Sequence, residues 1–122
     1  MTNAQSSPTQ FLPLTPAVFH IMLVLADEDR HGYDIMRAIA SATDGKLQMG
    51  PGTLYGTIKR MLQVGLIVET DERPDPALDD SRRRYYRLTD LGQQVLTAEV
   101  ERLSRLVEIA QRKNLLNQAR GT

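Results

Sequence analysis

The sequence predicts a mainly α-helical domain with one small β-hairpin, followed by a single long helix. Apolar residues recur at helical spacing in three short segments between residues 16 and 63. The pattern changes to that of short strands at residues 66–70 and 83–88, and a helical pattern without a breaker then runs from residue 90 to about 114. Three helices followed by a two-stranded hairpin form the order of a winged helix-turn-helix domain.

The composition is that of a small globular protein and excludes several kinds of site. The 122 residues suffice for one domain, with 41% hydrophobic and 25% charged residues and a net charge of zero. The absence of cysteine excludes disulfides, a thiolate nucleophile and a cysteine-based zinc site. No apolar run reaches the roughly 20 residues that span a bilayer, and the N-terminus lacks the pattern of a signal peptide. We therefore expect a cytoplasmic protein without membrane contact.

The first helix has a marked N-terminus. Thr15 is a capping residue, and Pro16 suits the first helical position because its missing N–H costs nothing there. The apolar residues that follow predict a helix over about residues 16–26. Within it, His20 reads as a partly buried structural histidine. Residues 27–30, which are Asp, Glu, Asp and Arg, read as a solvated turn.

A second helix is predicted over about residues 32–43, and Gly45 ends it. Its inner face consists of Ile35, Met36, Ile39 and Ala40. His31 opens this helix, where a capping or packing role suits it better than catalysis. Asp27, Asp29 and His31 together offer metal-ligand side chains, but a solvated turn is a poor setting for such a site. We predict no metal and no cofactor.

The third helix carries the feature on which the functional prediction depends. Pro51 suits its first position, and Gly65 suits the residue just past its end. An apolar stripe runs along one side: Leu54, Tyr55, Ile58, Met61 and Leu62. The other side carries hydroxyls, a glycine, two cations and an amide, but no acid: Thr53, Gly56, Thr57, Lys59, Arg60 and Gln63. Such a face can lie close to phosphates and base edges. An ordinary solvated helix face is the alternative interpretation.

The hairpin concentrates positive charge on its second strand. Four arginines lie on this strand or immediately before it: Arg82, Arg83, Arg84 and Arg87. Alternation predicts two faces for this strand, with Arg84, Tyr86 and Leu88 on one and Tyr85 and Arg87 on the other. Residues 71–82, with two prolines and four aspartates, are too long for a tight turn and predict a mobile tip. Basic residues in both the third helix and the hairpin favour DNA binding, although such residues also serve as surface solubilisers.

The last helix carries an apolar stripe that is too long for a small core. Thr89 caps the helix and Asp90 suits its first turn. Five residues spaced 4, 3, 4 and 3 apart form the seam of a coiled coil: Leu96, Val100, Leu103, Val107 and Ala110. Leu91 and Val95 precede the seam and are expected to pack on the core. We expect the same helix of a second subunit to cover the seam. The alternative is a stripe that folds back on its own core.

Four motifs in order resemble the PadR family of bacterial transcriptional regulators: His31-Gly32-Tyr33-Asp34-Ile35, Gly52-Thr53-Leu54-Tyr55, Gly65-Leu66-Ile67 and the run from Arg83 to Gly92. The likeness covers about residues 12–110 and is to the compact subgroup with one helix after the wing. It implies a homodimeric repressor on a roughly palindromic operator in double-stranded DNA. It also implies relief by an aromatic or apolar small molecule, for which the modest side chains of Val107, Ile109 and Ala110 leave a cavity in the dimer. Gly56 departs from the family, which often has proline there.

The sequence therefore predicts a DNA-binding transcriptional regulator without catalytic residues. A winged-helix module for protein–protein contact is the alternative. The predicted DNA-contacting residues are Thr53, Tyr55, Gly56, Thr57, Lys59, Arg60, Gln63, Arg82, Arg83 and Arg84. The predicted divisions are a mobile arm (1–11), a winged helix-turn-helix DNA-binding domain (12–89), a dimerisation helix (90–116) and a flexible tail (117–122).

Overall fold

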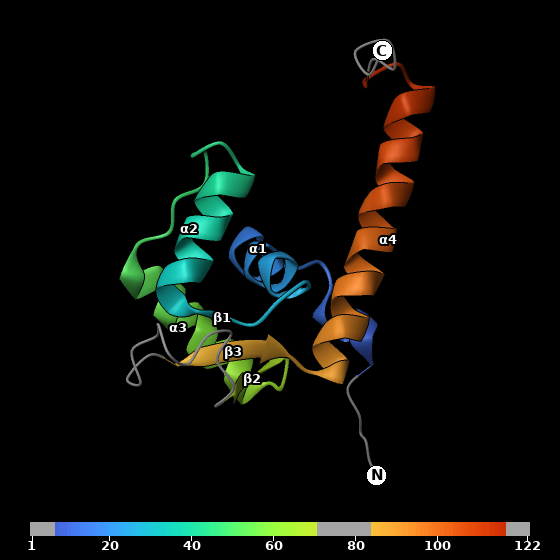
Figure 1. Cartoon of the computed structure of the whole chain (residues 1–122). Coiled ribbons are helices and arrows are strands. Elements are labelled where there is room, and N and C mark those ends of the chain that lie inside the picture. Colours follow the sequence, from blue (N-terminus) through green and yellow to red (C-terminus); the bar gives the residue numbers. More distant parts are fainter. Residues whose placement is uncertain (1–6, 71–83, 117–122) are drawn as a thin grey trace.

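The computed structural model describes residues 7–70 and 84–116 and confirms the mainly helical fold class with a small antiparallel sheet. The elements in chain order are η1 (Pro8–Phe11), α1 (Pro16–Leu25), β1 (Arg30–His31), α2 (Gly32–Ala42), α3 (Pro51–Gln63), β2 (Ile67–Thr70), β3 (Tyr85–Leu88) and α4 (Asp90–Arg112). In Figure 1, α1 lies at the centre, with α2 on one side, α4 on the other, and α3 and the sheet beneath.

One hydrophobic core joins these elements. Helix α1 contacts α2, α3, α4 and β3. The fully buried apolar side chains at its centre are Ile21, Met22, Ile35, Ile39, Leu54 and Val95. These residues come from four helices, and each belongs to an apolar pattern of helical period. The core therefore fixes how α3 presents its opposite side to solvent.

The predicted helix caps are confirmed. The Thr15 side chain accepts a hydrogen bond from the Val18 N–H, and the Thr89 side chain accepts one from the Gly92 N–H. The His31 ring also caps, since its Nδ1 accepts from the Asp34 N–H at 3.1 Å. These bonds satisfy donors that a helix N-terminus leaves without intrahelical partners.

The sheet has three strands in the order β1-β3-β2, one more than the sequence predicted. Arg30, predicted as the last residue of a turn over residues 27–30, instead begins β1. In this strand Arg30 pairs with Tyr86 and His31 with Tyr85. A two-residue strand has no periodicity of its own, so only its pairing with β3 reveals it. The wing itself is the predicted hairpin of β2 and β3, in a register that pairs Ile67 with Leu88.

The predicted alternation along the second hairpin strand does not separate a buried side from an exposed one. Both Tyr85 and Tyr86 are buried, although they point to opposite sides of the strand. The His31 ring packs edge-on against the Tyr85 ring, with 5.3 Å between the ring centroids. The ring of His31, the last residue of β1, thus covers the Tyr85 side of β3.

The N-terminal segment is more ordered than its polar composition suggested. The predicted arm (1–11) contains the 3₁₀ helix η1, which packs against α4 (Figure 1). Phe11 is partly buried against the core and anchors this segment. Residues 1–6 of the arm and 117–122 of the predicted tail lie outside the described residues.

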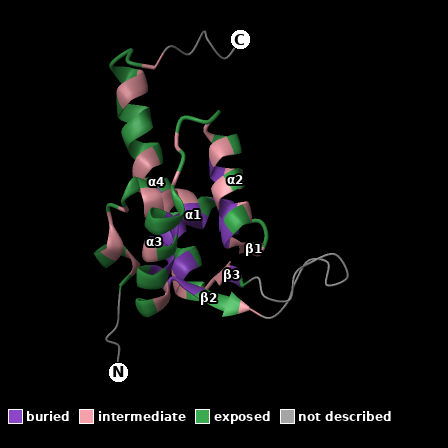
Figure 2. Ribbon diagram, turned by 90° about the vertical axis from the view of Figure 1, so that its left-hand side faces the viewer, coloured by how far each residue is buried: buried purple, intermediate pink, exposed green. Residues whose placement is uncertain are grey.

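Helix α4 divides into two halves. Gly92, Val95, Leu96 and Glu99 in its first half are buried, while Val100, Leu106 and Val107 in its second half are exposed. Figure 2 shows buried residues only near the base of this helix, and its other end stands clear of the body. Leu91 and Val95 pack on the core as predicted.

The placement of Leu96 in the coiled-coil seam is wrong, because this side chain is only 4% exposed within its own chain's core. Gly92 explains how the first half of α4 sits so close: a side chain there would collide with the Leu66 carbonyl oxygen. Within the described ranges, none of the helices combines the length and apolar character needed to span a bilayer.

Candidate nucleic-acid interface

Helix α3 presents a continuous polar face to solvent. Its apolar residues Leu54, Ile58 and Met61 are buried against the core, which fixes the rotation of the helix about its axis. Five residues on the opposite side are exposed: Gly52, Thr53, Lys59, Arg60 and Gln63. Of the predicted contact residues on this helix, the structure thus brings Thr53, Lys59, Arg60 and Gln63 to one open surface.

The positive charge of this face is not neutralised by the protein. In the part of the chain that the structure describes, neither Lys59 nor Arg60 forms an ion pair. The Arg60 Nη2 donates to the Thr57 hydroxyl oxygen at 3.3 Å, which holds the guanidinium along the helix. Unpaired, exposed cations on a helix face are available to phosphate oxygens.

The prediction that Thr57 faces DNA is wrong. Its side chain is 1% exposed, because it lies at the border between the polar face and the apolar stripe. Its hydroxyl donates to the Thr53 carbonyl oxygen at 2.7 Å, so burial leaves no polar group unsatisfied. Thr57 therefore contributes indirectly, by receiving the hydrogen bond from Arg60.

Tyr55 has a packing role and remains partly open to solvent. Its side chain is 46% exposed, and its hydroxyl lies where a Gly32 side chain would be. Any larger residue at Gly32 would displace the ring. Tyr55 thus sets the distance between α3 and the first turn of α2.

Gly56 lies in open space at the middle of the polar face. A Cβ atom added there would meet only the Arg60 guanidinium, at 3.8 Å, which is an ordinary contact. The fold therefore does not require glycine at this position, although glycine in a helix interior costs about 1 kcal/mol relative to alanine. Contact with a binding partner, rather than packing within the chain, would therefore explain the glycine at position 56.

Of the predicted wing contacts, Arg84 is the one that lies within the described residues. Arg84 Nη1 lies 2.9 Å from Glu69 Oε1 across the hairpin, and both side chains are well exposed. Burial, and next the Glu69 charge, raise the pKa of the Tyr86 phenol, so it stays a neutral hydroxyl at physiological pH. The predicted contacts Arg82 and Arg83, and the tip at 71–82, lie outside the described residues.

The acidic cluster that follows α1 stabilises the sheet, a role the sequence analysis missed. The Asp29 carboxylate accepts hydrogen bonds from Nε and Nη2 of Arg87, and Nη2 lies 2.7 Å from Oδ2. Arg30 pairs with Asp34 at 3.0 Å and lies 3.6 Å and 3.7 Å from Asp27 and Glu28. Arg87 thus ties the wing to the β1 turn. In the two described ranges, no three potential metal-ligating side chains gather.

A second missed feature lies on α2. The Arg37 guanidinium sits over the Tyr33 ring, 5.8 Å from its centroid, and Tyr33 is 55% exposed. Helical spacing of four residues is the one sequence signal that pairs them. A cation stacked on an aromatic ring gives α2 a further exposed basic group.

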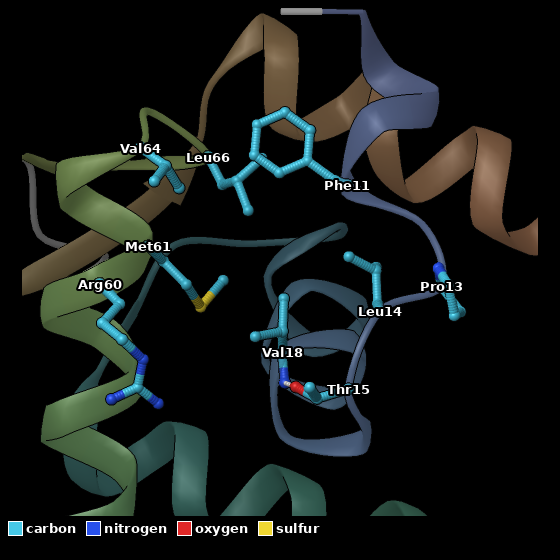
Figure 3. Close-up of a pocket in the computed structure, with 9 residues that line it drawn as sticks. All are labelled: Phe11, Pro13, Leu14, Thr15, Val18, Arg60, Met61, Val64 and Leu66. Atoms are coloured by element: carbon cyan, nitrogen blue, oxygen red, sulfur yellow. Dashed lines mark hydrogen bonds between the residues drawn. The ribbon is translucent and has the colours of Figure 1, made fainter.

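An open apolar groove of about 220 Å³ lies beside Arg60. Figure 3 shows Phe11, Leu14 and Val18 of the N-terminal segment and α1 facing Met61 and Leu66 across it. Arg60 is the one charged residue in its lining. The groove thus lies between the N-terminal segment and the C-terminal half of α3.

The arrangement is suited to binding an anionic surface rather than to catalysis. The polar face of α3 carries two cations, and Arg84 of the wing is a further exposed cation. Phosphates attract such a face, and short side chains allow close approach to base edges.

Comparison with known proteins gives this arrangement a family. The family model described as the transcriptional regulator PadR-like family matches residues 21–98, which run from the second half of α1 into the first half of α4. Transcriptional regulator YqjI of Escherichia coli (strain K12) is 27% identical over 88 residues, 72% of this chain and 39% of that protein.

Two solved structures share the fold. A PadR family transcription regulator from hypervirulent Clostridium difficile R20291 has a TM-score of 0.65 at 23% identity, over 80% of this chain and 97% of that chain. Bacillus subtilis PadR in complex with operator DNA has a TM-score of 0.58 at 22% identity, over 72% of this chain and 48% of that chain. The winged-helix fold class is thereby confirmed.

Proposed function

The chain belongs to the transcriptional regulator PadR-like family, and from that premise we propose that it is a homodimeric repressor of a roughly palindromic operator. As a member of this family it is a DNA-binding transcription regulator and not an enzyme. The observation that carries the proposal is the exposed face of α3, which has two unpaired cations and no acid. The solved complex of Bacillus subtilis PadR with operator DNA shares this fold and supports operator binding by this chain.

In the proposed complex, α3 lies in the major groove. Arg60 and Gln63 have the donors that recognise guanine and adenine edges, and Lys59 suits a phosphate. Because the Thr53 side chain is short and Gly56 has none, the α3 backbone can come close to the DNA. Tyr55 adds a phenol at the edge of this surface.

The wing holds the complex along the phosphate backbone. Arg84 contacts a phosphate by exchanging its Glu69 partner, which costs little because both side chains are exposed. Arg82 and Arg83 continue the same basic run in the sequence and remain part of the proposed wing contact.

The second half of α4 forms the proposed dimer interface. Its apolar side chains continue past the core, and in the described chain Val100, Leu106 and Val107 are exposed while Leu103 and Ala110 are partly exposed. A stripe of this length on a helix that stands away from the body suits a second copy of the same helix. Two copies would then present two α3 helices to two half-sites.

The proposed repressor is relieved by an aromatic or apolar small molecule. The family resemblance supports this, as do the modest side chains of Val107, Ile109 and Ala110, which would leave space between paired helices. A thermal-stability screen of planar aromatic compounds tests it. A compound that raises the melting temperature and releases DNA is expected, and a screen in which none does so contradicts the effector.

A fluorescence-anisotropy titration against the DNA immediately upstream of the protein's own gene tests the main proposal. We expect tight binding that resists random competitor duplex, involves two subunits per site and weakens steeply with salt. Weak binding, equal for both DNAs and insensitive to salt, would contradict it and favour the protein–protein interaction module.

A further inference from the structure

One carboxylate is buried at the point where α4 leaves the body. Glu99 is 2% exposed and is the one charged side chain buried in the described part of the chain. Its Oε2 accepts from the Leu14 N–H at 2.9 Å, 85 residues away in sequence. Arg102, one turn further along α4, donates through Nε to Oε1 at 2.6 Å and through Nη2 to Oε2 at 3.0 Å.

The bond from Leu14 to Glu99 joins the segment before α1 to α4. Apolar packing also joins these two elements, but without a fixed direction. Leu14 belongs to the segment that leads from η1 into α1, and it lines the groove beside Arg60. Glu99 is the last buried residue of α4. The carboxylate therefore lies between the body that carries α3 and the half of α4 that stands free.

Stability alone is a weak reason for a charge at this position. Burying a carboxylate costs free energy, and apolar residues of similar volume often stabilise a fold as well as a buried ion pair does. Directional hydrogen bonds do something that apolar contacts do not: they hold one orientation of the helix against the segment. The Arg102 bonds also hold the pKa of Glu99 below its usual value, which keeps it charged.

The free half of α4 magnifies any change of orientation. From residue 99 to residue 112 the helix extends about 20 Å, at roughly 1.5 Å per residue. A rotation of about 10° at Glu99 moves the far end by roughly 3.5 Å, close to the rise of one base pair in DNA.

We propose that Glu99 is a positioning residue that fixes the direction in which α4 leaves the body, and thereby sets the spacing of the two half-sites. The spacing rests on the proposed dimeric repressor, whereas the direction of α4 is a property of one chain. The two can therefore be tested separately.

The direction is measured by electron–electron distance spectroscopy within one chain. The protein has no cysteine, so spin labels attach only where Ser41→Cys on α2 and Arg112→Cys on α4 introduce them. Both positions are exposed. Dilution with an excess of unlabelled chain leaves at most one labelled copy per dimer.

Three variants of the labelled chain separate orientation from stability. Glu99→Met removes every bond of the carboxylate but keeps an apolar side chain of similar length. Glu99→Gln keeps an acceptor for the Leu14 N–H and loses the charge that Arg102 requires. Val95→Ala is the matched control, because it weakens the packing of the same half of α4 without touching these bonds.

We expect a narrow distance distribution for the parent, a distribution at least twice as wide for Glu99→Met, and an intermediate one for Glu99→Gln. Val95→Ala should lower the melting temperature and keep the parent's width. A parent-like width in Glu99→Met, or equal broadening in Val95→Ala, would overturn the positioning role. If Glu99→Met does not fold, the comparison of Glu99→Gln with Val95→Ala decides in the same way.

The consequence for DNA is measured with operators whose half-sites are moved apart or together by one base pair. The parent should lose at least tenfold in affinity for each shifted operator, and Glu99→Met less than threefold. Equal losses in both would overturn the spacing role. If the parent binds no operator, the repressor proposal and the spacing role fail together, while the distance distributions still decide whether Glu99 directs α4.

Discussion

The exposed face of α3 and the exposed half of α4 are both helix surfaces that the described chain leaves uncovered, and their chemistry is opposite. The α3 face carries Lys59, Arg60 and Gln63 with no acid among them. The α4 surface carries apolar side chains such as Val100 and Val107, which are 44% and 45% exposed. One surface suits an anion and the other suits an apolar partner.

One small domain thus presents two chemically distinct surfaces on two separate helices. Both helices bury one side in the same core, through Leu54 on α3 and Val95 on α4. The core therefore fixes the two outer surfaces relative to each other. Changes on one surface should therefore leave the other intact.

The largest effect is expected from Val107→Glu on α4. An acid in the proposed interface must be buried without a partner, so the dimer dissociation constant should rise at least a thousandfold. Analytical ultracentrifugation measures it. Arg105→Glu is the matched control, since it places an acid on an exposed part of the same helix away from the apolar stripe. A dimer that survives Val107→Glu would show that this stripe is not the interface.

The next effect is expected from combining Lys59→Ala and Arg60→Ala on α3. Loss of one base contact and one phosphate contact in each of the two subunits should weaken operator binding by about 2–4 kcal/mol, and the salt slope should fall by about 2, roughly 0.9 for each lost phosphate contact. The dimer should be unchanged. Lys46→Ala, an exposed cation before α3, is the control. An equal loss of affinity in that control would mean that α3 is not the reading helix.

A smaller effect is expected at the junction of the two regions, from Glu99→Gln. Since the Arg102 bonds lower the pKa of Glu99 below its usual 4.5, the carboxylate stabilises the fold above that pH and less as the pH falls through its folded-state pKa. We expect Glu99→Gln to cost about 1–3 kcal/mol at pH 7. Urea denaturation at pH 7, 5 and 3.5 measures the cost. A difference from the parent that grows toward acid would contradict this assignment.

The smallest effect is expected from Gly56→Ala, in opposite directions on fold and function. The added methyl group has room, so the free energy of unfolding should rise by roughly 0.5–1 kcal/mol. Operator affinity should fall, because the methyl group stands between the helix and the DNA. Thr97→Ala, exposed on α4, is the control that improves helix propensity away from the DNA. Unchanged or improved operator binding in Gly56→Ala would remove this glycine from the proposed interface.

Local signals in the sequence predicted most of the fold. Thr15, His31 and Thr89 cap helices as expected, because capping depends on residues within one turn. Strand β1 was missed since two residues carry no period, and it exists through its pairing with β3.

The errors at the candidate site have a shared cause. Thr57 lies at the border of a helical stripe, and which side of that border is covered depends on the neighbouring helix. Leu96 fits a coiled-coil spacing and a core position equally well, and the packing of α4 on the body decides between them. Glu99 was not singled out from the sequence, because no local pattern signals a hydrogen bond to Leu14, 85 residues away.

A mixing experiment tests the division of tasks most directly. Parent protein binds a labelled operator in the presence of excess unlabelled chain that carries either Lys59→Ala with Arg60→Ala or Val107→Glu. The chain with Lys59→Ala and Arg60→Ala should pair with the parent through its intact α4. It should abolish tight binding, because each mixed dimer then has only one α3 that can contact the operator. The Val107→Glu chain should leave binding unchanged, because it cannot pair with the parent. Interference by Val107→Glu, or none by the α3 variant, would contradict the account.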